Sequence, residues 1–170
     1  MSTPQPRERC ADCPVRERGA PFCWRDMRDE LMLLRPLATR RELARGEILF
    51  NQGDPVVGWW LVTRGQIHEY VVDAEGREQI IRMAPPGAPA GLAGLRMTPA
   101  YCYGARAGRQ GAEVYFVERD ATWRAIQNNP DLACALISGL SEELTLSYMR
   151  LHHVSTLPAR SVVASILLMT

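Results

Sequence analysis

Short apolar stretches separated by turn residues fill the middle of the chain, from about residue 41 to residue 118. The stretches "EILF", "WWLVTRG", "QIHEYVVD", "REQIIRMA", "YCYGARA" and "AEVYFVER" are bounded by glycine, proline or acidic residues, and each is predicted to be a strand. In "QIHEYVVD" the alternation places Ile67, Glu69 and Val71 on one face. Many short strands at this spacing predict an antiparallel β-roll or sandwich.

Helical patterns flank this region. The stretch "LMLLRPLA" before it predicts a short helix ended by Pro36, and Asp120 is predicted to cap the helix "ATWRAIQ". Asn129 followed by Pro130 predicts the start of a long helix that runs to about Ser155.

The long helix carries an apolar seam at alternating spacings of three and four residues, with one polar member. A narrow seam of this kind on a long helix favours pairing with a second copy of the chain over packing on its own roll. The predicted dimer contacts are Ile137, Leu140, Leu144, Ser147, Leu151 and Val154.

These patterns divide the chain into four parts: a cysteine-containing segment (1–30), the roll (31–128), the dimerisation helix (129–156) and the start of a further region (157–170). The last part begins an apolar helix that has no C-cap glycine and no polar finish. We therefore expect the chain to continue into another domain.

Composition narrows the functional classes. Hydrophobic residues make up 46% of the chain, charged residues 23%, and the net charge is +1, so no strongly basic surface for nucleic acid is indicated. A signal peptide and a membrane-spanning run are both missing from the pattern, which predicts a cytoplasmic protein without a membrane partner. No nucleophile elbow, phosphate loop or zinc-protease helix is present, so an enzyme is not expected.

At this point the chain resembles the Crp/Fnr family of bacterial transcription regulators. The resemblance rests on "RGEILFNQGD", "WWLVTRGQIHEYVVDAEGREQIIR", "PPGAPAGLAGL", "NNPDLACALISGLSEEL" and "LPARSVVASILL", which occur in the family's order. It implies an α+β fold: a cyclic-nucleotide-binding-type antiparallel β-roll (jelly roll) followed by a long dimerisation helix. It also implies a homodimer, and a DNA-binding winged helix-turn-helix in the full-length protein only.

Members of this family that bind cyclic AMP hold the ribose with a glycine–glutamate pair, and the phosphate with an arginine followed by serine or threonine. Gly91 matches the glycine, but Leu92 replaces the glutamate, and Tyr101 and Cys102 replace the phosphate-binding pair. Because a buried phosphate needs a cation and N–H donors, the sequence argues against cyclic AMP. Another small molecule would meet Gly91, Leu92, Tyr101 and Tyr103.

The first three cysteines suggest a metal site. Cys10, Cys13 and Cys23 form a C-x2-C-x9-C pattern, and thiolates bind soft metals and iron–sulfur clusters. The pattern resembles the oxygen-sensing Fnr branch, where three N-terminal cysteines and one in the roll hold a [4Fe–4S] cluster that oxygen destroys. In this chain Cys102, in the predicted roll, is the best replacement for the fourth ligand. The third spacing is longer than in that branch, and no cysteine lies near Tyr115, where the branch has its fourth ligand.

Other readings of the same residues stay open. The thiols can instead hold zinc with His68 or another residue as fourth ligand, switch through a disulfide between Cys10 and Cys13, or be incidental. Cys134 is expected to be a small buried residue. For the whole chain, the alternative to a regulator sensing oxygen, nitric oxide or redox state is a stand-alone cyclic-nucleotide-like module. Such a module would bind another small molecule or act on a protein partner.

Overall fold

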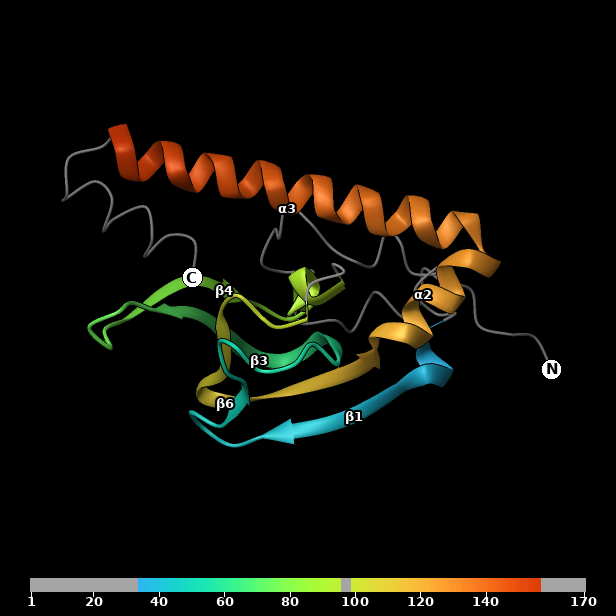
Figure 1. The fold of residues 1–170 in the computed structure, drawn as a ribbon, viewed down its shortest axis with the longest axis horizontal. Coiled ribbons are helices and arrows are strands. Elements are labelled where there is room, and N and C mark those ends of the chain that lie inside the picture. The colour runs from blue at the N-terminus through green and yellow to red at the C-terminus, as the bar shows by residue number, and fades with distance from the viewer. Residues whose placement is uncertain (1–33, 96–98, 157–170) are drawn as a thin grey trace.

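The computed structural model describes residues 34–95 and 99–156. In this part of the chain an antiparallel sheet is rolled up below a long helix, with a shorter helix joining the two at one end (Figure 1). The elements in chain order are η3 (Arg35–Leu37), β1 (Ala38–Leu43), β2 (Ile48–Phe50), β3 (Gly58–Val72), β4 (Glu78–Ala84), β5 (Pro89–Ala90), η4 (Leu92–Leu95), β6 (Gly104–Glu118), α2 (Arg119–Asn128) and α3 (Pro130–Thr156). The predicted roll followed by a long helix is confirmed.

Two long strands form the frame of the roll. β3 and β6 pair antiparallel along most of their lengths, β1 and β2 add to β6, and β4 and β5 add to β3. The prediction that "WWLVTRG" and "QIHEYVVD" are separate strands is wrong. Gly65 takes a φ of +72° beside a bulge, so the chain bends without leaving the sheet and β3 continues to Val72.

The described start of the chain differs from the predicted helix ended by Pro36. Arg35–Leu37 form a single 3-10 turn with Pro36 inside it, and β1 begins directly afterwards at Ala38. Proline is accommodated because the first N–H groups of a helical turn have no partner within the turn. β1 then pairs along its whole length with β6.

Consecutive tryptophans separate two apolar cores. Trp60 points into the roll, where it stacks near Phe50, while Trp59 lies under the helices in a cluster with Leu132 and Leu136 of α3. Neighbouring strand residues face opposite sides of a sheet, so this pair attaches the helices to the roll from one strand.

The two helices begin differently. α2 begins at Arg119 after Glu118, so the predicted cap on Asp120 is wrong, and Glu118 makes no side-chain cap hydrogen bond. α3 begins as predicted: Asn129 Oδ1 accepts hydrogen bonds from the N–H groups of Asp131 (3.0 Å) and Leu132 (3.3 Å). Across the described residues, neither helix is long and apolar enough to cross a membrane.

Candidate functional site

Tyr101 fills the roll where the sequence suggested a small-molecule pocket. It is 3% exposed, and its ring stacks on Phe50 with centroids 4.0 Å apart. The hydroxyl donates to the carbonyl oxygen of Gly58 (2.6 Å) and accepts from the N–H of Gly58 (3.2 Å). Burial raises the pKa of Tyr101, so the phenol stays protonated and keeps donating. Tyr101 is therefore a core residue that ties β3 to the segment before β6.

The other pocket candidates lie on two sides of the sheet. Tyr103 packs against the aromatic core inside the roll, near Phe50. Leu92 is buried in the cluster beneath the helices, and Gly91 turns the chain just before it with a φ of +74°. The structure thus places Tyr101 and Tyr103 together and keeps Leu92 apart from them. An open hollow lies elsewhere, where β3 begins and β6 meets α2, lined by Val56, Val57, Phe116, Glu118, Arg119 and Asp120.

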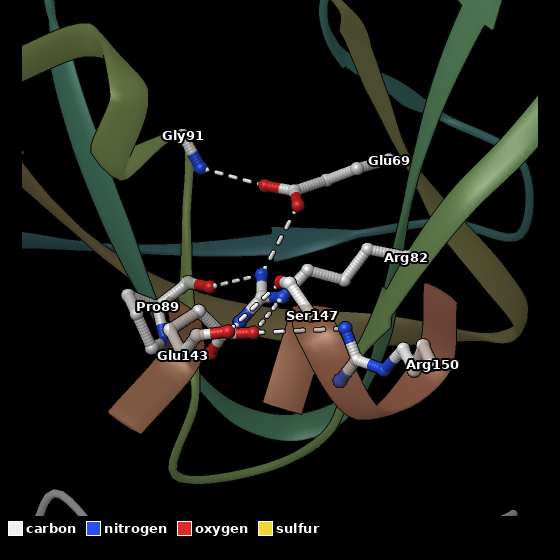
Figure 2. A network of polar contacts seen from close by, with 7 residues as sticks. All are labelled: Glu69, Arg82, Pro89, Gly91, Glu143, Ser147 and Arg150. Atoms are coloured by element: carbon white, nitrogen blue, oxygen red, sulfur yellow. Dashed lines mark hydrogen bonds and ion pairs between the residues drawn. The ribbon is translucent and has the colours of Figure 1, made fainter. Parts of the chain in front are cut away.

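A buried carboxylate, that of Glu69, binds the backbone N–H of Gly91. Glu69 on β3 is 4% exposed, and its Oε1 accepts a hydrogen bond from the N–H of Gly91 at 2.9 Å. Its Oε2 accepts from Nη1 of Arg82 on β4 at 3.1 Å. Figure 2 shows Glu69 between Gly91 and Arg82, with one oxygen aimed at each. The N–H at the predicted ligand position is thereby already bound within the chain.

Arg82 carries the network on to helix α3. Its Nε and Nη2 each lie 2.7 Å from a different oxygen of Glu143, and Nη1 also donates to the carbonyl oxygen of Pro89 at 2.7 Å (Figure 2). Burial by itself would lower the pKa of Arg82, but Glu69 and Glu143 outweigh it and raise the pKa well above its usual value. A fork-to-fork pair of this kind fixes direction as well as distance.

Helix α3 presents two different faces along its length. The face toward the roll carries buried Leu132, Ala135, Leu136 and Gly139, followed by the partly buried Glu143, Leu146 and Arg150. The other face is the predicted seam, and its apolar members Ile137, Leu140, Leu144 and Leu151 are 63%, 45%, 51% and 66% exposed. Ser147 is exposed and donates to the carbonyl oxygen of Glu143 (2.8 Å), whereas the side chain of Val154 lies outside the described residues. The seam is therefore not used by the chain's own roll.

The thiols of the predicted cluster are only partly within the described residues. Cys10, Cys13 and Cys23 lie outside them. Cys102 is an exposed free thiol in the turn before β6. Cys134 is exposed on α3, so the expectation that it is buried is wrong, because it falls outside the roll-facing stripe of the helix.

Within the described part of the chain, no group of three or more histidine, cysteine, aspartate or glutamate side chains is placed to hold a metal ion. His68, the alternative zinc ligand, lies on β3 beside Arg106 and Arg109 of β6. Burial lowers the pKa of His68, and the two arginines lower it further. A further positive charge beside these two arginines, such as a bound zinc ion, is disfavoured in such surroundings.

Sequence reasoning missed the residues that join the roll to the helix: Glu69, Arg82 and Glu143. One signal was available, since the strand alternation put Glu69 on the face of Ile67, which is fully buried. A carboxylate on a buried face needs a cation or N–H donors. Nothing in the local pattern identified Arg82 or Glu143 as those partners.

Comparison with known proteins agrees with the fold. The cyclic nucleotide-binding domain family matches residues 40–129. The HTH-type transcriptional regulator Cmr of Mycobacterium tuberculosis (strain CDC 1551 / Oshkosh) is 27% identical over 158 residues, which cover 93% of this chain and 62% of Cmr. The chain thus spans less than two thirds of the length of this relative.

Two solved structures share the architecture. FixK2 from Bradyrhizobium japonicum superimposes with a TM-score of 0.68 at 24% identity, covering 77% of this chain and 64% of FixK2. The sensor domain of the transcriptional regulator DNR from Pseudomonas aeruginosa gives a TM-score of 0.58 at 25% identity. That match covers 79% of this chain and 97% of the DNR sensor domain.

Proposed function

The chain belongs to the cyclic nucleotide-binding domain family, and we propose that it is the sensor and dimerisation part of a Crp/Fnr-type transcription regulator acting in the cytoplasm. The observation that carries this proposal is helix α3, which lies along the roll with an apolar seam turned to solvent. The likeness to Cmr over most of the chain and to the DNR sensor domain supports it. DNA binding belongs, in this proposal, to a domain that follows α3, and no enzymatic step is assigned.

The seam makes a second copy of the chain the partner of α3. Four large apolar side chains repeat along 15 residues of one face, the pattern of a two-stranded coiled coil. Paired seams would bring two following domains to the spacing of a palindromic DNA site. Sedimentation of the purified chain tests this pairing, and a monomer at every concentration would contradict it.

Cyclic AMP is not the proposed signal. The ring of Tyr101 occupies the interior of the roll and its hydroxyl donates a hydrogen bond to the carbonyl oxygen of Gly58, while Glu69 accepts a hydrogen bond from the N–H of Gly91. A buried phosphate would meet the Glu69 carboxylate and would need Arg82, which two carboxylates already bind. Calorimetric titration should give no binding heat with cyclic AMP at millimolar concentration. Saturable binding would refute this part of the proposal.

We propose instead that a [4Fe–4S] cluster on Cys10, Cys13, Cys23 and Cys102 carries the signal. Cys102 fits this role because its thiol is free and exposed on the roll surface. Such a cluster supplies reactivity toward oxygen, nitric oxide or a change of redox state. The residues of this chain supply the thiolates, and their arrival at one place would connect the N-terminal segment to the roll.

Anaerobic purification tests this assignment directly. We expect a brown protein with about four irons per chain that bleaches in air. Cys102→Ser should lower the iron content and the visible absorption, whereas Cys134→Ser, which alters an equally free and exposed thiol, should leave both unchanged. A colourless, iron-free parent protein would remove the cluster, and a full cluster in Cys102→Ser would exclude Cys102 as a ligand.

A further inference from the structure

The network centred on Arg82 joins four separate segments of the chain. It connects β3 through Glu69, β4 through Arg82, the turns around β5 through Pro89 and Gly91, and α3 through Glu143. The side chains of Glu69, Arg82 and Glu143 are 5%, 12% and 21% exposed, so the network is deepest on the roll side and opens toward the helix. Each carboxylate oxygen in it accepts a hydrogen bond.

The position of Glu143 along α3 gives this network its importance. The first part of the helix is held by apolar packing through Leu132, Ala135 and Leu136. After Gly139 the roll-facing positions are only partly buried, and Arg82 grips the helix there through both oxygens of Glu143. The second half of α3 therefore adds a charged contact, through Glu143, to the partly buried Leu146, whereas the first half is held by buried apolar side chains.

We propose that Glu69, Arg82 and Glu143 form a built-in latch that holds the second half of α3 on the roll without any bound ligand. Glu69 anchors Arg82 from the roll and satisfies the N–H of Gly91, and the guanidinium then grips Glu143. An anion entering this region would need the same two donors, the Gly91 N–H and Arg82, and the chain's own carboxylates already hold them.

The latch also sets which face of the helix points outward. Because Glu143 must face Arg82, Leu140 and Leu144 are held to one side of the roll contact, about 60° and 100° around the helix from Glu143, and both are half exposed there. Rotation of the second half of α3 would break the two parallel hydrogen bonds together, since a bidentate pair tolerates little change of direction. Latch closure and outward presentation of the seam are thus one structural state. This inference goes beyond the proposed function, because neither the cluster nor DNA enters it.

Hydrogen–deuterium exchange read by mass spectrometry tests the latch. Arg82→Met removes the guanidinium and keeps an unbranched apolar stem, and Glu143→Gln keeps the shape of the side chain and removes its charge. Removing one partner of a partly buried ion pair leaves the other uncompensated, so we expect peptides from residues 140–156 to exchange about tenfold faster or more in both variants. Peptides from β6 should exchange as in the parent.

Arg150→Gln is the matched control. Arg150 also reaches Glu143, at 3.8 Å, but its side chain is 41% exposed, and exposed pairs contribute little. Its exchange should resemble that of the parent, and millimolar cyclic AMP should not slow exchange in the parent's α3. All samples are compared at a concentration where sedimentation gives them the same oligomeric state.

Three results would overturn the latch. Parent-like exchange of residues 140–156 in both Arg82→Met and Glu143→Gln would show that the network does not hold the helix. Equal acceleration in β6 and α3 would make the network a general stability element. Slower exchange of the parent's α3 on addition of cyclic AMP would show that the helix waits for a ligand. A colourless protein, in contrast, would affect only the cluster proposal.

Discussion

Tyr101→Phe removes one hydroxyl whose hydrogen-bond partners are Gly58 and Val57. The substitution keeps the ring that stacks on Phe50 and removes only the oxygen that links the roll's core to the start of β3. That oxygen donates to the carbonyl of Gly58 and accepts from the N–H groups of Gly58 and Val57 at 3.2 and 3.4 Å. No water is needed to complete this set of contacts.

The cost follows from burial. Gly58 is buried, so the loss of its hydroxyl partner leaves polar backbone groups poorly satisfied, while Val57 is exposed and can bond water instead. A buried group left without its partner costs about 1–3 kcal/mol. We therefore expect the free energy of unfolding to fall by about 2 kcal/mol, which corresponds to a loss of about 4–8 °C in melting temperature for a chain of this size.

Urea and thermal unfolding followed by circular dichroism measure this change. Tyr115→Phe is the matched control, since Tyr115 lies half-buried on β6 and its hydroxyl makes no hydrogen bond with a described residue. The control should shift the melting temperature by less than about 2 °C. If Tyr101→Phe behaves like the control, the hydroxyl does not stabilise the roll and the reasoning is wrong.

Three further predictions concern the helix, a titrating group and a bend. Leu144→Ala should weaken self-association in sedimentation by at least about tenfold, because the change occurs twice in a paired seam. Thr145→Ala, next to it but outside the seam, should leave self-association unchanged, and equal pairing of the two variants would show that the seam is misassigned. The pKa of His68 is lowered in the folded chain, so below about pH 6.5 the unfolded chain binds more protons than the folded one, and stability should rise with pH up to that value and then level off. His68→Gln should flatten this part of the profile of urea midpoint against pH, and parallel profiles for parent and variant would contradict the prediction. Gly65→Ala should destabilise the roll by about 3 kcal/mol or more, since a Cβ would stand 2.1 Å from the Gly111 carbonyl oxygen at a φ of +72°. Gly76→Ala, at a similar φ but in open space, should cost about 1–2 kcal/mol, and similar losses at both positions would refute the steric argument.

The sequence predicted those features that depend on a few neighbouring residues. Asn129 before Pro130 located the start of α3, and the seam through Leu140 and Leu144 proved to be exposed. The prediction that Asp120 caps α2 and the prediction that Cys134 is buried were both wrong, which shows the limit of reasoning from residue preferences. A side-chain preference locates a helix only approximately, and the face that is buried depends on where the helix lies against the sheet.

The rest depended on geometry that no local pattern carries. The pairing of β3 with β4 shifts register between Glu69 and Tyr70, with Ile81 of β4 as the extra residue, and Glu69 and Tyr70 are both buried although they are adjacent in sequence. Arg82 and Glu143 are 61 residues apart, and an arginine or glutamate at such positions ordinarily indicates an exposed surface. They pair because the fold places β4 beneath α3.

Two neighbouring sides of helix α3 serve different contacts. Leu136 and Glu143 contact the roll, while Leu140 and Leu144 are exposed and available to a neighbouring molecule. These positions alternate along one 27-residue helix. A substitution on this helix therefore reveals by its position alone which of the two attachments it damages. The same interleaving offers a route to variants that pair selectively, because the outward residues can be changed for a new partner while the inward ones keep the helix in place.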